Sequence, residues 1–167
     1  MVTRLNASTF DSSYFRQVLG HLPTGVVAIS AMDEGEPVGL TVGSFTSVSL
    51  EPPLVGFFPS RSSTSWPRIE RAGSFVANIL AEHQAELSTS LATSGGDKFG
   101  QLSWHRGLTG APVIDGAAAW IECEVADVHP AGDHLFVLGR VLDLSVAADL
   151  RPLAFFRGKY VRISDSV

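Results

Sequence analysis

Cysteine is almost absent from this chain, because Cys123 is the only one among 167 residues. A single thiol cannot form an internal disulfide, and it cannot by itself build a thiolate metal site. The five histidines show none of the close spacings of a metal site either. We therefore expect no metal, and the scarcity of cysteine favours a reducing compartment and a cytoplasmic location.

Long apolar runs are also missing. The longest, over residues 25–32 and 134–144, are about half the length that a membrane-spanning helix needs, and the N-terminus lacks the pattern of a signal peptide. Positive charge is scarce, with 12 Lys and Arg against 17 Asp and Glu and a formal net charge of -5. Neither a membrane nor nucleic acid is expected as a partner.

Two common catalytic turns do not occur. The sequence contains no Gly-x-Ser-x-Gly elbow, and no Gly-x-Gly-x-x-Gly turn follows a strand, so the usual support for a hydrolase or a Rossmann domain is lacking. Glu122 and Glu124 stand two residues apart in a strand pattern and share a face. We expect this pair to face water, which is the ordinary case for carboxylates, rather than to act as in a glycosidase.

The chain does contain enough apolar material for a core, since hydrophobic residues make up 45% of it and charged residues 17%. We expect one domain over residues 1–167, with residues 1–10 flexible. Apolar positions at helical spacing predict a helix over residues 11–22. Asp11 or Ser12 can cap this helix, and Pro23 ends it.

Strand patterns dominate the rest. Period-two or continuous apolar runs predict strands over residues 26–29, 38–50 (one strand or a pair), 54–58, 74–80, 119–126, 135–144 and 153–163. The turn 33–36 makes the first two an opening hairpin, and two short helices are expected, one between Pro67 and Gly73 and one over residues 82–91. Strands with short inserted helices and no regular βαβ alternation predict a mainly β, predominantly antiparallel barrel or sandwich.

Two hydroxyl-rich segments are candidates for holding a polar ligand. Residues 41–49 carry five hydroxyl groups, and Gly43 among them lets a ligand approach the backbone; the alternative is a solvent-facing strand in which threonine serves β propensity. Residues 60–65, Ser-Arg-Ser-Ser-Thr-Ser, lie between a strand and a helix, where free N–H groups and Arg61 favour an anion such as a phosphate. The alternative there is an ordinary capping loop.

Two further groups lie later in the chain. Gly132-Asp133-His134 places a histidine at the start of a strand, where it can reach a cleft and hydrogen-bond a carboxamide or phosphate. Arg157-Gly158-Lys159-Tyr160 places a cation and an aromatic ring around a glycine. Each group has a plainer alternative, a structural histidine in the first case and solvated charge in the second.

Taken together with their neighbours, these groups form an ordered set. The set consists of Phe15-Arg16-Gln17-Val18-Leu19-Gly20 with Leu22-Pro23-Thr24-Gly25-Val26; Ser44-Phe45 with Ser47-Val48-Ser49-Leu50-Glu51-Pro52-Pro53-Leu54-Val55; Ser74-Phe75-Val76-Ala77-Asn78-Ile79-Leu80; Asp97-Lys98-Phe99; Gly132-Asp133-His134; and Pro152-Leu153 with Phe155-Phe156-Arg157-Gly158-Lys159-Tyr160. Its order and spacing resemble the flavin reductase family with the FMN-binding split-barrel fold. The similarity is closest to the reductase components of two-component aromatic-compound monooxygenases.

The resemblance implies a split β-barrel of Greek-key topology with a few short helices, paired as a homodimer with flavin at the subunit interface. It implies that Thr41, Val42, Gly43, Ser44 and Ser47 line the flavin ring and ribityl chain and that the phosphate lies on Ser60, Arg61, Ser62, Ser63 and Thr64. Asn78 would hydrogen-bond the flavin, and Lys98 and Phe99 would close over it from a mobile loop. His134 would be the catalytic residue and would receive the nicotinamide together with Arg157 and Tyr160.

The activity implied by the resemblance is hydride transfer from NADH or NADPH to FMN or FAD, with the reduced flavin passed transiently to an oxygenase. The two cofactors supply the difficult chemistry, which accounts for the lack of an acid–base triad. Many relatives have asparagine where this chain has Gly43, so the choice between FMN and FAD stays open. Two alternatives remain, a flavin-binding or storage protein without catalysis and a pyridoxamine-phosphate-oxidase-like enzyme.

Overall fold

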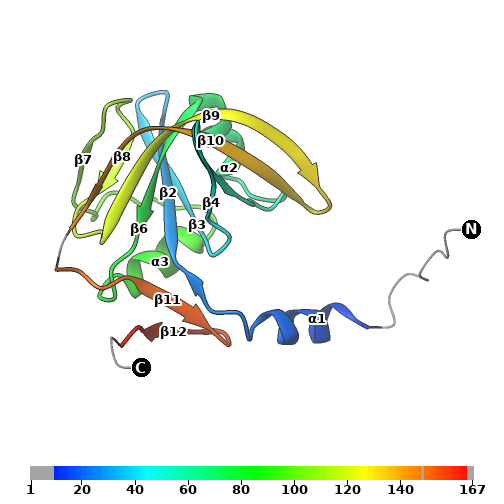
Figure 1. The fold of residues 1–167 in the computed structure, drawn as a ribbon. Helices are drawn as coiled ribbons and strands as arrows, with labels where there is room; N and C mark the ends of the chain where they lie inside the picture. Colours follow the sequence, from blue (N-terminus) through cyan, green and yellow to red (C-terminus); the bar gives the residue numbers. More distant parts are fainter. Residues whose placement is uncertain (1–9, 148, 165–167) are drawn as a thin grey trace, which may run out of the picture.

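The computed structural model describes residues 10–147 and 149–164. Figure 1 shows a body of strands with a helix extending to one side of it. In chain order the elements are α1 (Ser12–Leu19), β1 (Thr24–Gly25), β2 (Val27–Asp33), β3 (Glu36–Val42), β4 (Thr46–Leu50), β5 (Pro53–Phe57), α2 (Trp66–Ala72), β6 (Ser74–Ile79), α3 (Ala85–Ala92), β7 (Trp104–Arg106), β8 (Pro112–Ile114), β9 (Ala119–Ala131), β10 (His134–Val146), β11 (Leu153–Phe156) and β12 (Lys159–Arg162).

The strands form three sheets. The main sheet has seven strands in the order β3-β2-β6-β9-β10-β5-β4, a second has the order β1-β11-β12, and β7 pairs with β8 alone. Every pairing between these strands is antiparallel. Because β3 and β4 are the unjoined edges of the main sheet, the barrel stays open. The prediction of a mainly β split barrel is therefore confirmed.

The opening hairpin follows from its turn. Glu34 and Gly35 both have positive φ, at 51° and 86°, and they connect β2 to β3 with Asp33 opposite Glu36. Two such residues make the tight turn whose twist matches that of the flanking strands. The predicted hairpin at this position is confirmed.

Several predicted boundaries are wrong, for local reasons. Asp11 caps α1 by accepting a hydrogen bond from the Tyr14 N–H at 2.8 Å, but the helix ends at Leu19 because Gly20 forms the C-cap before Pro23 is reached. The run 38–50 is a pair, β3 and β4, which is one of the two predicted alternatives, whereas β9 continues to Ala131 instead of ending at residue 126. The short strands β1, β7 and β8 were not predicted. Most of the segment 1–10, for which we expected flexibility, lies outside the described residues.

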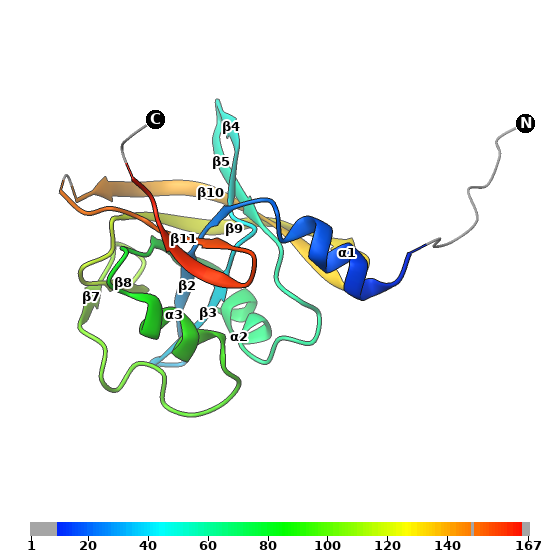
Figure 2. The same ribbon diagram turned by 90° about the horizontal axis from the view of Figure 1, so that it is seen from below.

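Helix α2 is tied to the opening hairpin by charge. The carboxylate of Asp33, only 3% exposed, accepts hydrogen bonds from Arg71 Nη2 at 2.7 Å and from Arg68 Nε at 2.8 Å. Arg71, and after it Arg68, lowers the pKa of Asp33 from its ordinary 3.8 to about 2. Both α2 and α3 contact β2 and β3 (Figure 2). These contacts fix the helices beside the edge of the main sheet.

The core of the sheet is aromatic. Phe57 meets Trp66 and Phe75 edge-on, with ring centroids 5.8 and 5.3 Å apart, a favourable geometry for paired rings. Cys123 lies fully buried in the same cluster, and burial raises the pKa of its thiol to about 12. The thiol is therefore protonated and unreactive at neutral pH. In the described part of the chain, no helix is both long enough and apolar enough to cross a membrane.

The expectation for Glu122 is wrong. Its carboxylate is fully buried and accepts hydrogen bonds from the Leu108 N–H at 2.8 Å, and from the N–H and the Oγ1 of Thr109, both at 2.6 Å. The connection between β7 and β8 covers this face of β9, which the period-two pattern could not reveal. Glu124 does stay partly exposed, and it pairs with Arg140.

Candidate functional site

A cavity of about 630 Å³ opens beside Thr24 of β1, where four further segments of the chain meet. They are the end of β3, the loop between β5 and α2, the end of α3 with the loop that follows, and the start of β10. We call it the central cavity. It brings together ten of the residues singled out from the sequence: Thr41, Val42, Gly43, Ser44, Ser60, Ser62, Ser63, Thr64, Lys98 and His134.

The wall from β3 is shaped by its own hydrogen bonds. Thr41 Oγ1 donates to the carbonyl of Ser88 in α3 at 3.1 Å, and Ser44 Oγ accepts from the Phe58 N–H at 3.0 Å. At Gly43 an added Cβ would lie 2.9 Å from Thr24 Oγ1, so the small residue lets β1 approach here. This wall is therefore preformed by packing against β1, α3 and β5.

Residues 60–65, which we call the serine-rich loop, are held by hydrogen bonds at both ends. Ser60 Oγ lies 2.8 Å from Ser62 Oγ, and Ser63 Oγ accepts from the Trp66 N–H at 3.2 Å, at the start of α2. Ser60, Ser62, Ser63 and Thr64, each with a hydroxyl group, all line the central cavity. Converging hydroxyls beside a cation suit a phosphate group.

This loop is also joined to the turn that carries His134. The Arg61 N–H donates to the Asp133 carbonyl and the Leu135 N–H to the Pro59 carbonyl, each at 3.0 Å. Arg61 itself turns away, since its Nη1 donates to the Gly132 carbonyl at 3.4 Å and its side chain does not line the central cavity. Arg61 therefore links the serine-rich loop to the turn at residues 132–134 and does not face the cavity.

His134 lies at the edge of the cavity and is oriented by its neighbour. Its Nδ1 lies 2.7 Å from Asp133 Oδ1, and this hydrogen bond lowers the pKa of Asp133. With Nδ1 engaged, Nε2 is the ring nitrogen left to meet a ligand. The arrangement suits recognition of a carboxamide or phosphate at the cavity edge.

Lys98 supplies the cation of the central cavity. Its Nζ donates to the Leu91 carbonyl at the end of α3 at 2.9 Å. Burial lowers the pKa of this ammonium group. Sequence reasoning placed Lys98 in a loop but missed two other residues of the cavity, Ala92 at the end of α3 and its C-cap residue Thr93, because only the packing of α3 on β3 brings them there.

Three of the residues singled out lie elsewhere. Asn78 is fully buried; its Nδ2 donates to Ser30 Oγ at 2.9 Å and its Oδ1 accepts from the Ile114 N–H at 2.8 Å, so its amide is engaged inside the protein. Phe99 is 4% exposed and packs in the second core cluster, with Leu91 and Leu153 among its members. Ser47 is exposed on β4 and does not line the cavity.

Arg157 and Tyr160 are separated from His134 as well. Arg157 stacks its guanidinium on Phe156, 5.1 Å from the ring centroid, and borders a surface groove beside α1. Tyr160 donates its hydroxyl to Ser88 Oγ at 2.8 Å and lines a smaller pocket that shares Thr41, Val42 and Gly43 with the central cavity. Of the two, only Tyr160 adjoins the central cavity.

An open antiparallel barrel with this hydroxyl-lined cavity defines a protein of the flavin-binding split-barrel class. The family described as "Flavin reductase like domain" matches residues 19–164. The chain belongs to this family.

Three relatives show the range of the match. A flavin reductase from Pseudomonas putida is 49% identical over 154 residues, which cover 92% of this chain and 91% of that protein. The solved structure of a nitrilotriacetate monooxygenase component B homologue from Mycobacterium thermoresistibile is 45% identical with a TM-score of 0.89, over 92% of this chain and 87% of that one. The NADH:FAD oxidoreductase SgcE6 from Streptomyces globisporus, solved with NAD and FAD fragments, is 32% identical with a TM-score of 0.88, over 93% of this chain and 94% of that one.

Proposed function

We propose that this protein reduces FMN or FAD with NADH or NADPH and passes the reduced flavin to a partner monooxygenase. The observation that carries the proposal is the central cavity, in which the end of β3, the serine-rich loop, Lys98 and His134 meet. Hydroxyls and an ammonium group beside apolar walls suit a phosphorylated planar ring. A bound flavin would supply the hydride acceptor and a reduced nicotinamide the hydride.

Different side chains of the cavity bind different parts of the flavin and the nicotinamide. Ser60, Ser62, Ser63 and Thr64 hold the flavin phosphate through their hydroxyls, and Lys98 adds a positive charge. Thr41, Val42 and Ser44 form the wall for the ring and ribityl chain. His134, oriented by Asp133, positions the nicotinamide against the ring. Orientation of two bound reactants can itself contribute several kcal/mol, on the order of 7 to 11 in the best cases.

The proposed partner is an oxygenase that uses the reduced flavin. A monooxygenase component B homologue is among the relatives, which supports an oxygenase as the partner that receives the reduced flavin. The cavity is open at the surface, which favours release of the reduced flavin.

A cytoplasmic location is proposed because the one cysteine is a free thiol.

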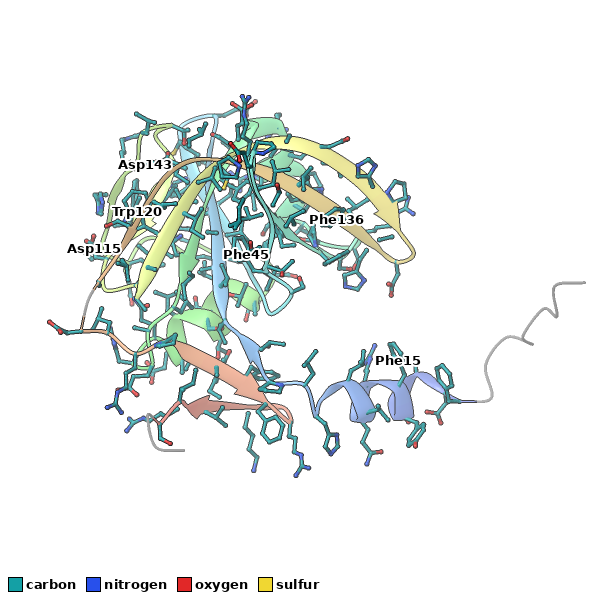
Figure 3. All side chains as sticks on the ribbon, in the orientation of Figure 1. Phe15, Phe45, Asp115, Trp120, Phe136 and Asp143 are labelled. Carbon is teal, nitrogen blue, oxygen red and sulfur yellow. The ribbon has the colours of Figure 1, made fainter. Side chains whose placement is uncertain are left out.

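We also propose that the protein works as a homodimer. None of the residues of α1 is buried, and Val18, Leu19 and Leu22 are each at least half exposed. Figure 3 shows Phe15 on this helix, apart from the body of strands. Exposed apolar side chains gathered on a helix and just after its end are typical of a protein interface.

NADH oxidation followed at 340 nm, with and without added FMN or FAD, tests the activity. Oxidation that rises and saturates with flavin is the expected result. Flavin binding without NADH oxidation would instead identify a flavin carrier, and oxygen-dependent turnover of a pyridoxine-like substrate without NADH would identify an oxidase.

A further inference from the structure

Lys98 is one of only two lysines in the chain, and the other is Lys159. Among the described residues that line the central cavity, Lys98 is the only lysine or arginine. Together with Thr64 and Ser65, it also lines a second cavity next to the central one, so these three residues meet at the junction of the two. Lys159 is exposed on β12 and does not line the central cavity. The side chains of the central cavity therefore include a single amine.

The surroundings of Lys98 suit a nucleophile. Its Nζ donates to the Leu91 carbonyl, an uncharged partner, at 2.9 Å. Asp97, the neighbour in sequence, accepts instead from the N–H groups of Phe99 and Gly100, at 3.1 and 2.8 Å. In the part of the chain that the structure describes, no carboxylate forms an ion pair with Lys98. Burial lowers the pKa of its ammonium group, which increases the share of the neutral, nucleophilic amine.

The hydroxyl groups near Lys98 can hold a phosphate beside this amine. Ser60, Ser62, Ser63 and Thr64 line the same cavity, and its described lining residues include no carboxylate that would repel an anion. Hydroxyl groups donate hydrogen bonds to phosphate oxygens without adding charge. A phosphorylated molecule bound there is held close to Nζ, so that attack by the amine becomes an effectively intramolecular step.

We propose that Lys98 is a covalent modification site for phosphorylated aldehydes. The phosphate binds the hydroxyl groups of the serine-rich loop, and Nζ attacks the carbonyl carbon. A C=N bond replaces the C=O bond, and the carbonyl oxygen leaves as water with the two hydrogens of the amine, so nothing is oxidised or reduced. Because the imine occupies the cavity, the aldehyde and a flavin phosphate exclude each other. This inference goes beyond the proposed function, since the modification needs no NADH oxidation.

The test uses the flavin-free full-length chain and pyridoxal phosphate as the probe. Borohydride reduces the imine to a stable secondary amine, and peptide mapping by mass spectrometry then measures the modified fraction at Lys98, at Lys159 and at the N-terminal amine. We expect Lys98 to react at least about tenfold faster than Lys159. Pyridoxal, which has the same aldehyde without the phosphate, should show less than about a twofold preference. Inorganic phosphate should slow the reaction of Lys98 and leave that of Lys159 unchanged.

Two pairs of variants sharpen the assignment. Lys98→Arg keeps the positive charge but removes the primary amine, so modification at this position should disappear, whereas Lys159→Arg should leave the rate at Lys98 unchanged. Thr64→Val removes one hydroxyl group beside Lys98 and should slow its reaction with pyridoxal phosphate about threefold, but not its reaction with pyridoxal. Thr46→Val is the matched control and should slow neither reaction, because Thr46 is exposed on β4 and does not line the central cavity.

Equal rates at Lys98 and Lys159 with pyridoxal phosphate would overturn the modification site. A preference for Lys98 that pyridoxal shares, or that inorganic phosphate does not weaken, would overturn it as well. FMN as a competitor separates this inference from the proposed function. Protection of Lys98 by both inorganic phosphate and FMN supports both proposals, whereas protection by phosphate alone supports the modification site and counts against the proposed flavin site.

Discussion

His134 is accessible at the edge of the central cavity and held by a single side chain. Because Asp133 engages Nδ1 at 2.7 Å, replacing the imidazole removes an oriented donor or acceptor without disturbing the serine-rich loop. We expect His134→Ala to raise the KM for NADH or NADPH by about tenfold and to change the Kd of the flavin by less than about twofold.

Steady-state kinetics with both nicotinamides, alongside flavin titration, check this prediction. His129→Ala is the control, since His129 is an exposed histidine on β9 that pairs with Asp127, stacks on Phe136 and does not line the central cavity. Unchanged kinetics in His134→Ala would remove the nicotinamide role from this residue.

Replacing Glu122 tests how much a single buried residue contributes to the stability of the fold. Its carboxylate accepts three hydrogen bonds from residues 108 and 109 inside a fully buried site. Glu122→Ala leaves those donors unpaired and should lower the free energy of unfolding by about 3 kcal/mol. Urea unfolding measures the loss, and Glu124→Ala, two residues away on β9 and partly exposed, should cost no more than about 1 kcal/mol.

At the scale of elements, Asp33 is the buried acid among the carboxylates that attach α2 to the opening hairpin. The pKa of Asp33 is about 2 in the folded protein and 3.8 ordinarily, so the folded state binds the proton less readily than the unfolded state. The stabilisation is therefore complete above about pH 4 and is lost as the pH falls toward 2.

Urea unfolding at several pH values checks this effect. The unmodified protein should lose stability over that range, and Asp33→Asn should be less stable at neutral pH but show a weaker dependence there. A variant with the same slope as the parent would assign the acid sensitivity to other carboxylates.

Much of the element order could be predicted from the sequence, because turn residues and two-residue periods act locally. Gly73 and Pro67 bound α2 as expected, and Asp11 caps α1. Burial could not be predicted where distant segments decide it. The β7–β8 connection covers Glu122, and the amide of Asn78 is held inside the protein by hydrogen bonds with Ser30 and Ile114.

Part of the candidate site could also be predicted. The cavity residues on β3 and the serine-rich loop were found because their hydroxyl groups are conspicuous in the sequence, whereas Ala92 and Thr93 carry no such signal.

At the scale of the whole molecule, α1 determines the expected assembly. Val18 is 51% exposed on a helix with no buried residue, so an acidic side chain there should oppose pairing of two copies. We expect a dimer by light scattering after size exclusion, and Val18→Glu should weaken it by at least about tenfold. Gln17→Glu, which adds the same charge one residue earlier, is the control and should stay dimeric. A monomeric parent protein would contradict the proposal.

The hydrogen bonds between the serine-rich loop and the turn at residues 132–134 carry a consequence for the chemistry. The Arg61 and Leu135 N–H groups join these two segments by hydrogen bonds, so the segment proposed for the flavin phosphate and the residue proposed for the nicotinamide belong to one connected stretch of backbone. A displacement of one segment is therefore expected to displace the other with it. On the proposed assignment, this coupling would keep the distance between hydride donor and acceptor constant while the surrounding surface moves.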